Sequence, residues 1–172
     1  MSALPIAAIV YTPTDNVEAL LMQAARALAA RGVRLGGVIQ HDLVTVIDDP
    51  CAMALENLET GECFPLSQAL GSGSVACRLD PAALAEGGAA VRGALARGAE
   101  LIIVNKFGAQ EATGGGLRDE MGFTAGAGVP LLTAVGERFL DEWTAFTGGA
   151  GSLLAPRLES VLAWWEELRA RG

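Results

Sequence analysis

Continuous apolar runs and helical periodicities alternate along the first quarter of the chain. Residues 6–11 (IAAIVY) are uninterrupted apolar positions, a pattern typical of a buried parallel strand. Residues 16–31 carry apolar side chains at helical spacing, and Gly32 supplies a stop signal. A second strand is predicted over residues 33–40. A strand, helix and strand in this order predict a parallel crossover unit.

Between residues 41 and 67 the pattern changes to short β-prone pieces separated by turn residues, which predicts a β-hairpin or meander. Beyond it, Asp80 and Pro81 resemble a helix cap and a first helical position. Strand and helix then alternate again. The pattern predicts helices over residues 81–97, 117–126, 137–146 and 153–169, and strands over residues 101–104 and 129–135.

This alternation predicts an α/β fold with three layers, a mostly parallel central sheet and a β-hairpin insertion. The 172 residues match the size of a single domain, so one domain over residues 1–172 is expected. Ligands of such sheets bind beyond the carboxyl ends of the strands. The segments where chemistry is expected are therefore 12–16, 105–116 and 136–138.

The first of these segments lacks the phosphate-binding loop that this position often carries. Such a loop needs glycines and a lysine, and residues 12–16 contain neither. Asp15 followed by Glu18 resembles a capping box, which favours a structural role. The polar side chains at this strand end are still candidates for an anion contact, because helix amino termini attract anions. They are Thr12, Thr14 and Asn16.

The second segment contains Lys106, the only lysine of a chain that has eleven arginines. It follows a buried strand, as does the Asn-Lys-x-Asp motif that reads guanine, but Gly108 replaces the aspartate. Lys106 is either a solvated rim residue or an anion ligand. Consecutive glycine amides and an arginine can complete an anion site here. The candidates are Asn105, Lys106, Gly115 and Arg118.

The third candidate segment is GSGSVACRLD, residues 71–80. Its Gly-Ser pairs offer amides and hydroxyls, and its arginine suits phosphate, molybdate or carboxylate. The candidates are Ser72, Ser74 and Arg78, although Arg78 is equally suited to pairing with Asp80.

The composition of the chain excludes some classes of binding partner. A net charge of −8 without a basic block argues against nucleic acid, and no apolar stretch approaches the length of a membrane span. Three cysteines without a C-x-x-C spacing suggest reduced thiols, so we expect a cytoplasmic protein. His41 and the cysteines are too widely spaced to predict a metal site. We expect one of Trp164 and Trp165 to face the core and the other to be exposed, which allows a homodimer.

Four stretches together resemble an uncharacterised bacterial domain family whose members are often encoded near molybdate-transport genes. They are GGVIQ (36–40), LETGECFPLSQ (58–68), SVACRLDP (74–81) and LIIVNKFGAQEATGGG (101–116). That family is similar to small nucleoside triphosphatases with a phosphate-loop fold. In those enzymes the first loop carries a glycine-rich lysine motif and the strand matching residues 101–104 ends in acids. This chain has neither, so the resemblance implies the scaffold with a degenerate phosphate loop.

The leading hypothesis is a binding or regulatory domain that holds a small anionic ligand, namely molybdate, phosphate or a nucleotide. The sequence does not identify a cofactor. One alternative is a magnesium-dependent nucleoside-triphosphate phosphohydrolase or phosphotransferase that uses Lys106 for charge and Glu111 or Asp15 for the metal or as a base. The other alternative is a partner-docking module.

Overall fold

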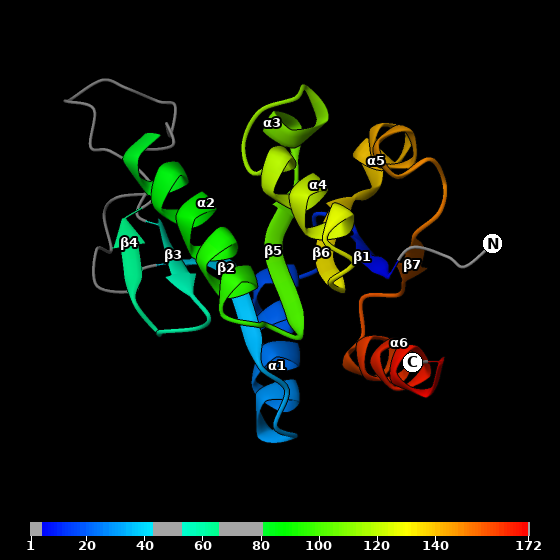
Figure 1. Cartoon of the computed structure of the whole chain (residues 1–172). Coiled ribbons are helices and arrows are strands. Elements are labelled where there is room, and N and C mark those ends of the chain that lie inside the picture. The colour runs from blue at the N-terminus through cyan, green and yellow to red at the C-terminus, as the bar shows by residue number, and fades with distance from the viewer. Residues whose placement is uncertain (1–4, 43–52, 66–80, 172) are drawn as a thin grey trace.

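A seven-stranded sheet forms the centre of the molecule in a computed structural model that describes residues 5–42, 53–65 and 81–171 (Figure 1). Its strand order is β4-β3-β2-β5-β6-β1-β7. The strands are β1 (Ile6–Tyr11), β2 (Leu35–Asp42), β3 (Met53–Asn57), β4 (Cys63–Pro65), β5 (Leu101–Phe107), β6 (Leu131–Gly136) and β7 (Ser152–Leu154).

The sheet is parallel except at one edge. β2, β5, β6, β1 and β7 pair in parallel, whereas β3 pairs antiparallel with β2 and β4 pairs antiparallel with β3. The predicted α/β fold with a mostly parallel sheet and a hairpin insertion is therefore confirmed. Within the segment between residues 41 and 67 where β-prone pieces were predicted, the piece LVTVI (43–47) lies outside the described residues.

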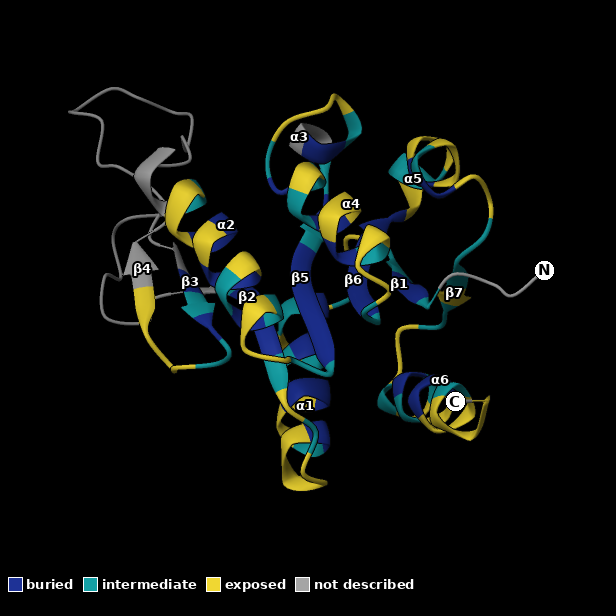
Figure 2. Ribbon diagram, viewed as in Figure 1, coloured by how far each residue is buried: buried dark blue, intermediate teal, exposed yellow. Residues whose placement is uncertain are grey.

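Helices cover both faces of the sheet and complete the three layers (Figure 1). One face is covered by α1 (Val17–Ala30) and α6 (Leu158–Arg171), and the other by α2 (Pro81–Ala96) and α4 (Arg118–Gly126). A short α3 (Ala109–Ala112) follows β5, while a 3-10 turn (Glu137–Phe139) and α5 (Leu140–Thr147) follow β6. The central strands are buried between these layers (Figure 2).

The central strands β2 and β5 approach each other closely at Gly37. This glycine has a φ of 107°, and a Cβ placed on it would lie 2.0 Å from the carbonyl oxygen of Ile103. Only glycine fits both the backbone conformation and the space. The sequence pattern GGV inside an apolar strand thus marks a close backbone approach.

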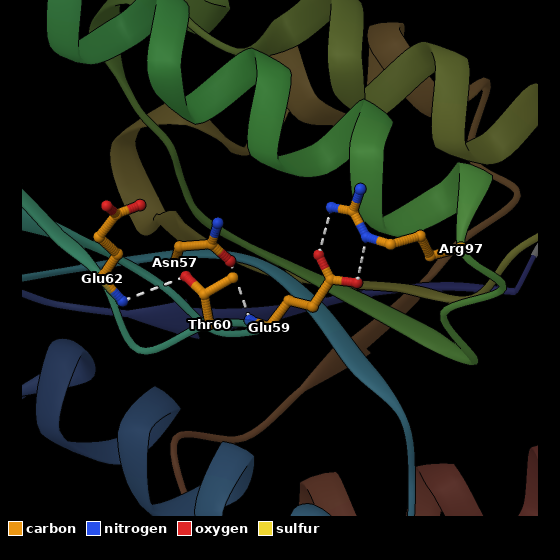
Figure 3. Close-up of polar contacts among 5 residues, drawn as sticks. All are labelled: Asn57, Glu59, Thr60, Glu62 and Arg97. Carbon is orange, nitrogen blue, oxygen red and sulfur yellow. Dashed lines mark hydrogen bonds and ion pairs between the residues drawn. The ribbon is translucent and has the colours of Figure 1, made fainter.

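The turn between β3 and β4 is attached to the end of α2 by polar contacts (Figure 3). Within the turn, the side-chain oxygen of Asn57 accepts a hydrogen bond from Glu59 N at 2.9 Å, and Thr60 Oγ1 accepts one from Glu62 N at 3.2 Å. Arg97 donates to both carboxylate oxygens of Glu59, from Nε at 2.8 Å and from a terminal nitrogen. The Arg97 contact holds the pKa of Glu59 below its ordinary value of 4.5.

Several predicted element boundaries are wrong. The second strand, predicted over 33–40, is Leu35–Asp42, and the strand predicted over 129–135 is Leu131–Gly136. Residues 152–154 form β7 beside β1, and the last helix begins only at Leu158 rather than at residue 153, because Pro156 disfavours a helical conformation for the residue before it. β5 continues to Phe107, so the loop predicted from residue 105 begins later. The helix predicted over 137–146 starts as a 3-10 turn. Asp80, the predicted cap of α2, lies outside the described residues.

Both tryptophans of α6 are buried, which contradicts the prediction that one is exposed. Trp164 and Trp165 are 8% and 5% exposed, and their ring centroids lie 6.3 Å apart in the core shared with α1. Since α6 packs against both the sheet and α1, two successive positions face apolar surroundings. The exposed tryptophan that suggested a homodimer is therefore not found. In the described part of the chain, no helix combines the length and apolar character that crossing a bilayer requires.

Candidate functional site

The carboxyl ends of β1, β5 and β6 bring three loops to one edge of the sheet. β6 lies between the other two strands, so the end of β1 and the end of β5 are separated by one strand. Gly136 ends β6, and a Cβ there would lie 3.6 Å from the ring of Tyr11. This is an ordinary van der Waals distance, so the Tyr11 ring lies directly beside the end of β6.

Lys106 lies across this edge, from β5 to the start of α1. Its ammonium nitrogen is 3.4 Å from Glu18 Oε1 and 5.5 Å from the centre of the Tyr11 ring. The lysine side chain is 33% exposed, so it is neither a core residue nor a freely solvated one. Partial burial alone lowers the pKa of Lys106, but the charges of Tyr11 and Glu18 and the hydrogen bonds to them outweigh it, so the pKa lies above its ordinary value of 10.5.

The loop at residues 12–16 uses its polar groups within itself. Asp15 Oδ2 accepts hydrogen bonds from Thr12 N at 2.9 Å and from Thr12 Oγ1 at 3.2 Å, and the Thr12 and Thr14 hydroxyl oxygens lie 2.8 Å apart. Asn16 is the cap of α1, since its side-chain oxygen accepts from Ala19 N at 3.1 Å. The predicted Asp15 capping box is therefore wrong. Asp15 bonds back to Thr12 because the helix begins one residue later than that motif requires.

Glu111 closes the segment that follows β5. Its buried carboxylate accepts hydrogen bonds from Gly108 N and Leu117 N, both at 3.0 Å. Arg118 donates to the Glu111 carbonyl oxygen at 3.0 Å and lies 4.9 Å from the centre of the Phe146 ring. Both charged groups thus brace the loop. The Glu111 carboxylate is occupied by amides rather than presented to a metal.

Asn105 contains a buried oxygen without a partner among the described residues. The residue is 5% exposed, and its Nδ2 donates to the carbonyl oxygen of Gln40 at 3.4 Å, which is long for a hydrogen bond. Its Oδ1 is buried and accepts nothing. An unpaired buried acceptor costs about 1–3 kcal/mol, so such groups in native proteins usually bond a water or a ligand.

The predicted site residues divide into three groups. Thr12, Thr14, Asn16, Asn105 and Lys106 lie at the described edge of the sheet, where Lys106 meets the start of α1. Gly115 lies in the loop closed by Glu111, and Arg118, the first residue of α4, donates to the Glu111 carbonyl oxygen. Ser72, Ser74 and Arg78 lie outside the described residues.

Sequence reasoning missed Tyr11 as a contact of Lys106 and treated Glu18 only as part of a cap. The available signal was the position of Tyr11, the single tyrosine, at the end of an apolar strand. Among the described residues no group of three or more metal-binding side chains comes together. Cys63 is exposed, and the side chain of His41 is not described.

Two hollows lie at the opposite, amino-terminal end of the sheet. They measure about 490 and 290 Å³ and share three lining residues: Glu100, Trp165 and Arg169. Arg169 is paired with Glu100 at 3.4 Å. None of the predicted site residues lines either hollow, so this end provides control positions for tests of the carboxyl edge.

Comparison with known proteins places this architecture. A human cancer-related nucleoside triphosphatase, known from a solution structure, aligns with a TM-score of 0.70 over 96% of this chain and 97% of its own, at 12% identity. That likeness supports the fold class. The "Molybdenum import ATP-binding protein ModC 2" of Bradyrhizobium diazoefficiens is 41% identical over 166 residues, which are 96% of this chain but 18% of that protein. A family model matches residues 6–164, and the chain belongs to that family, described as "Protein of unknown function (DUF2478)".

Proposed function

We propose that this chain is a ligand-binding regulatory domain that holds a small anion at Lys106, on a phosphate-loop-type scaffold that has lost its phosphate loop. The ligand is an oxyanion or the phosphate portion of a nucleotide. It would lie between the end of β5 and residues 12–16, where ligands of parallel α/β sheets bind.

The position of Lys106 supports this proposal above all. The ammonium group is held over the ring of Tyr11, and its charged neighbour is a carboxylate, Glu18, at the long distance of 3.4 Å. We infer that the Glu18 carboxylate occupies the position that an anionic ligand would take beside Lys106. An oxyanion that displaces Glu18 would meet a partly desolvated cation, which binds anions more strongly than a solvated one.

The relative gives this proposal a biological setting. The ModC 2 protein is named for molybdenum import, and this chain spans only 18% of its length. We infer that the domain senses a ligand for a larger molybdenum-import ATP-binding assembly, which makes molybdate a candidate along with phosphate and nucleotides. The activity of that larger protein is not assigned to this chain.

Binding is favoured over turnover by the residues at the sheet edge. A phosphoryl-transfer site aims cations and metal-holding acids at the reacting phosphate. Here the carboxylates of Asp15 and Glu111 accept hydrogen bonds from backbone amides, and residues 12–16 contain no lysine. Magnesium-dependent release of phosphate from a nucleoside triphosphate would replace this proposal by the hydrolase alternative.

Isothermal titration of the purified chain with molybdate, phosphate, sulfate and ATP tests the proposal. We expect saturable binding of at least one anion. Lys106→Ala should weaken it about tenfold or more, since it removes a charge-assisted contact. Glu18→Gln should strengthen it several-fold, because the competing carboxylate becomes neutral while the side chain keeps its size.

Arg169→Ala is the matched control, since it removes one positive charge at the opposite end of the sheet and should leave the affinity unchanged. If none of the four anions binds, or if Lys106→Ala binds as tightly as the parent chain, the proposal is wrong. Equal losses of affinity from Lys106→Ala and Arg169→Ala would mean that anion binding depends only on net charge. That result would also contradict the proposal.

A further inference from the structure

We propose that the anion bound at this site carries a hydrogen-bond donor of its own, an O–H or N–H group that Asn105 Oδ1 accepts. The inference rests on the proposed function and narrows its ligand. It favours hydrogenphosphate or a nucleotide over fully deprotonated oxyanions such as sulfate and molybdate.

The two residues that carry the inference are consecutive in the chain. Lys106 offers a positive charge at the end of β5, and Asn105 directly before it offers an acceptor that no described residue uses. Asn105 is 5% exposed, whereas buried side-chain oxygens in the rest of the described chain are paired. The side-chain amide has a defined orientation, because Nδ2 faces the carbonyl oxygen of Gln40 at the neighbouring strand.

A cation beside a buried acceptor distinguishes ligands by their protons. An anion without a proton can meet Lys106, but its oxygen would be repelled by the partial negative charge of Oδ1. An anion that carries an O–H group can meet both. A site with an unpaired acceptor therefore selects for the ligand that supplies the missing donor and discriminates against its analogue without one.

Reaching this oxygen requires a side chain to move, since Oδ1 is covered. Lys106, the next residue along β5, is held loosely enough to move. Its contact with Glu18 at 3.4 Å is long for a hydrogen bond, and a third of its side chain is exposed. We expect an anion that draws Lys106 away from Glu18 to gain access to Asn105 at the same time.

Hydrogenphosphate and sulfate provide the sharpest test. At mildly alkaline pH, above the second ionisation of phosphoric acid, both are predominantly tetrahedral dianions of similar size, and hydrogenphosphate carries one proton that sulfate lacks. We expect the parent chain to bind phosphate about tenfold or more tightly than sulfate, measured by isothermal titration at constant ionic strength. Molybdate should bind about as weakly as sulfate. AMP is included as a separate arm, so that a site for free phosphate and a site for a nucleotide are distinguished by which of the two binds more tightly.

Asn105→Leu should bring the phosphate and sulfate affinities together, because it removes the acceptor. Thr133→Val is the matched control. It removes another buried polar group, a hydroxyl that donates to the carbonyl oxygen of Val104, and should leave the phosphate preference intact. If Asn105→Leu does not fold, the preference of the parent chain still decides.

Equal affinity for phosphate and sulfate, or tighter binding of molybdate than of phosphate, would overturn this inference and leave the proposed function standing. Binding of none of these anions would overturn both.

Discussion

Two buried asparagines at strand ends have opposite surroundings. Asn57, at the end of β3, is 7% exposed, and its side-chain oxygen accepts a hydrogen bond from Glu59 N. Asn105, near the end of β5, is 5% exposed, and no described residue donates a hydrogen bond to its side-chain oxygen. The charged pair near Asn57, Arg97 with Glu59, is bidentate. The charged pair next to Asn105, Lys106 with Glu18, is a single contact of 3.4 Å.

The difference separates structural polar groups from groups available for binding. At the β3–β4 turn the side chains of Asn57, Glu59 and Thr60 each have a hydrogen-bond partner in the turn or in Arg97 (Figure 3). At the end of β5 the polar groups are only partly paired. Native proteins retain unpaired buried groups mainly where function requires them.

The largest effect should come from a change that disturbs both regions together. β2 carries Gly37, whose carbonyl oxygen accepts from Leu58 N, and β2 also pairs with β5. Gly37→Ala should destabilise the chain by about 3 kcal/mol, because the new Cβ meets Ile103 and the positive φ disfavours alanine. Chemical denaturation measures this, and Gly61→Ala is the control, since it shares a positive φ but meets nothing within 4 Å.

A somewhat smaller loss is expected from Glu111→Ala, which affects only the β5 region. The substitution leaves the buried amide of Leu117 and the partly buried amide of Gly108 unpaired. One unpaired buried group costs about 1–3 kcal/mol, so we expect a loss of about 2 kcal/mol. Hydrogen exchange should increase at these two amides while the β3–β4 turn stays protected. Unchanged exchange at both amides would show that the carboxylate does not hold the loop.

Replacing each asparagine by leucine tests the comparison directly. Asn57→Leu should cost about 1–3 kcal/mol, because the amide of Glu59 loses its acceptor. Asn105→Leu without ligand should change the stability by less than about 1 kcal/mol, since it removes an unpaired oxygen and one long hydrogen bond. Equal costs in denaturation would mean that Asn105 is as well paired as Asn57.

The smallest effects concern pH. The pKa of Glu59 is lowered in the folded chain, so the stability it contributes is present above its ordinary pKa of 4.5 and lost as pH falls through the folded value. The pKa of Lys106 is raised, so its contribution is present below 10.5 and lost as pH rises through the folded value. A plot of melting temperature against pH should become flatter for Glu59→Gln on the acid side only. The same plot should become flatter for Lys106→Met on the alkaline side only.

The sheet was predictable because its strands are continuous apolar runs. Residues 6–11 were predicted as a strand and match β1 residue for residue, since a strand buried on both faces shows no polar interruption. β7 was missed because its three residues are too short to show any period, and they were absorbed into the following helical pattern.

The site was only partly predictable. Lys106 and Asn105 were identified because strand ends of a parallel sheet are common ligand positions. Their contacts were not, since Glu18 lies 88 residues from Lys106 in sequence and no local signal joins them. The choice between Asp15 and Asn16 as the cap of α1 was also beyond the pattern, because both residue types cap helices equally well.

The contact between Lys106 and Tyr11 has a practical consequence. The chain has one lysine and one tyrosine, and these two side chains touch each other at the proposed site. Selective isotope labelling of tyrosine would therefore give a single ring spectrum, and labelling of lysine a single ammonium signal, both arising from the site. An amine-directed acylating reagent would have one side-chain target, and protection of that target by an added anion would report occupancy without any engineered probe.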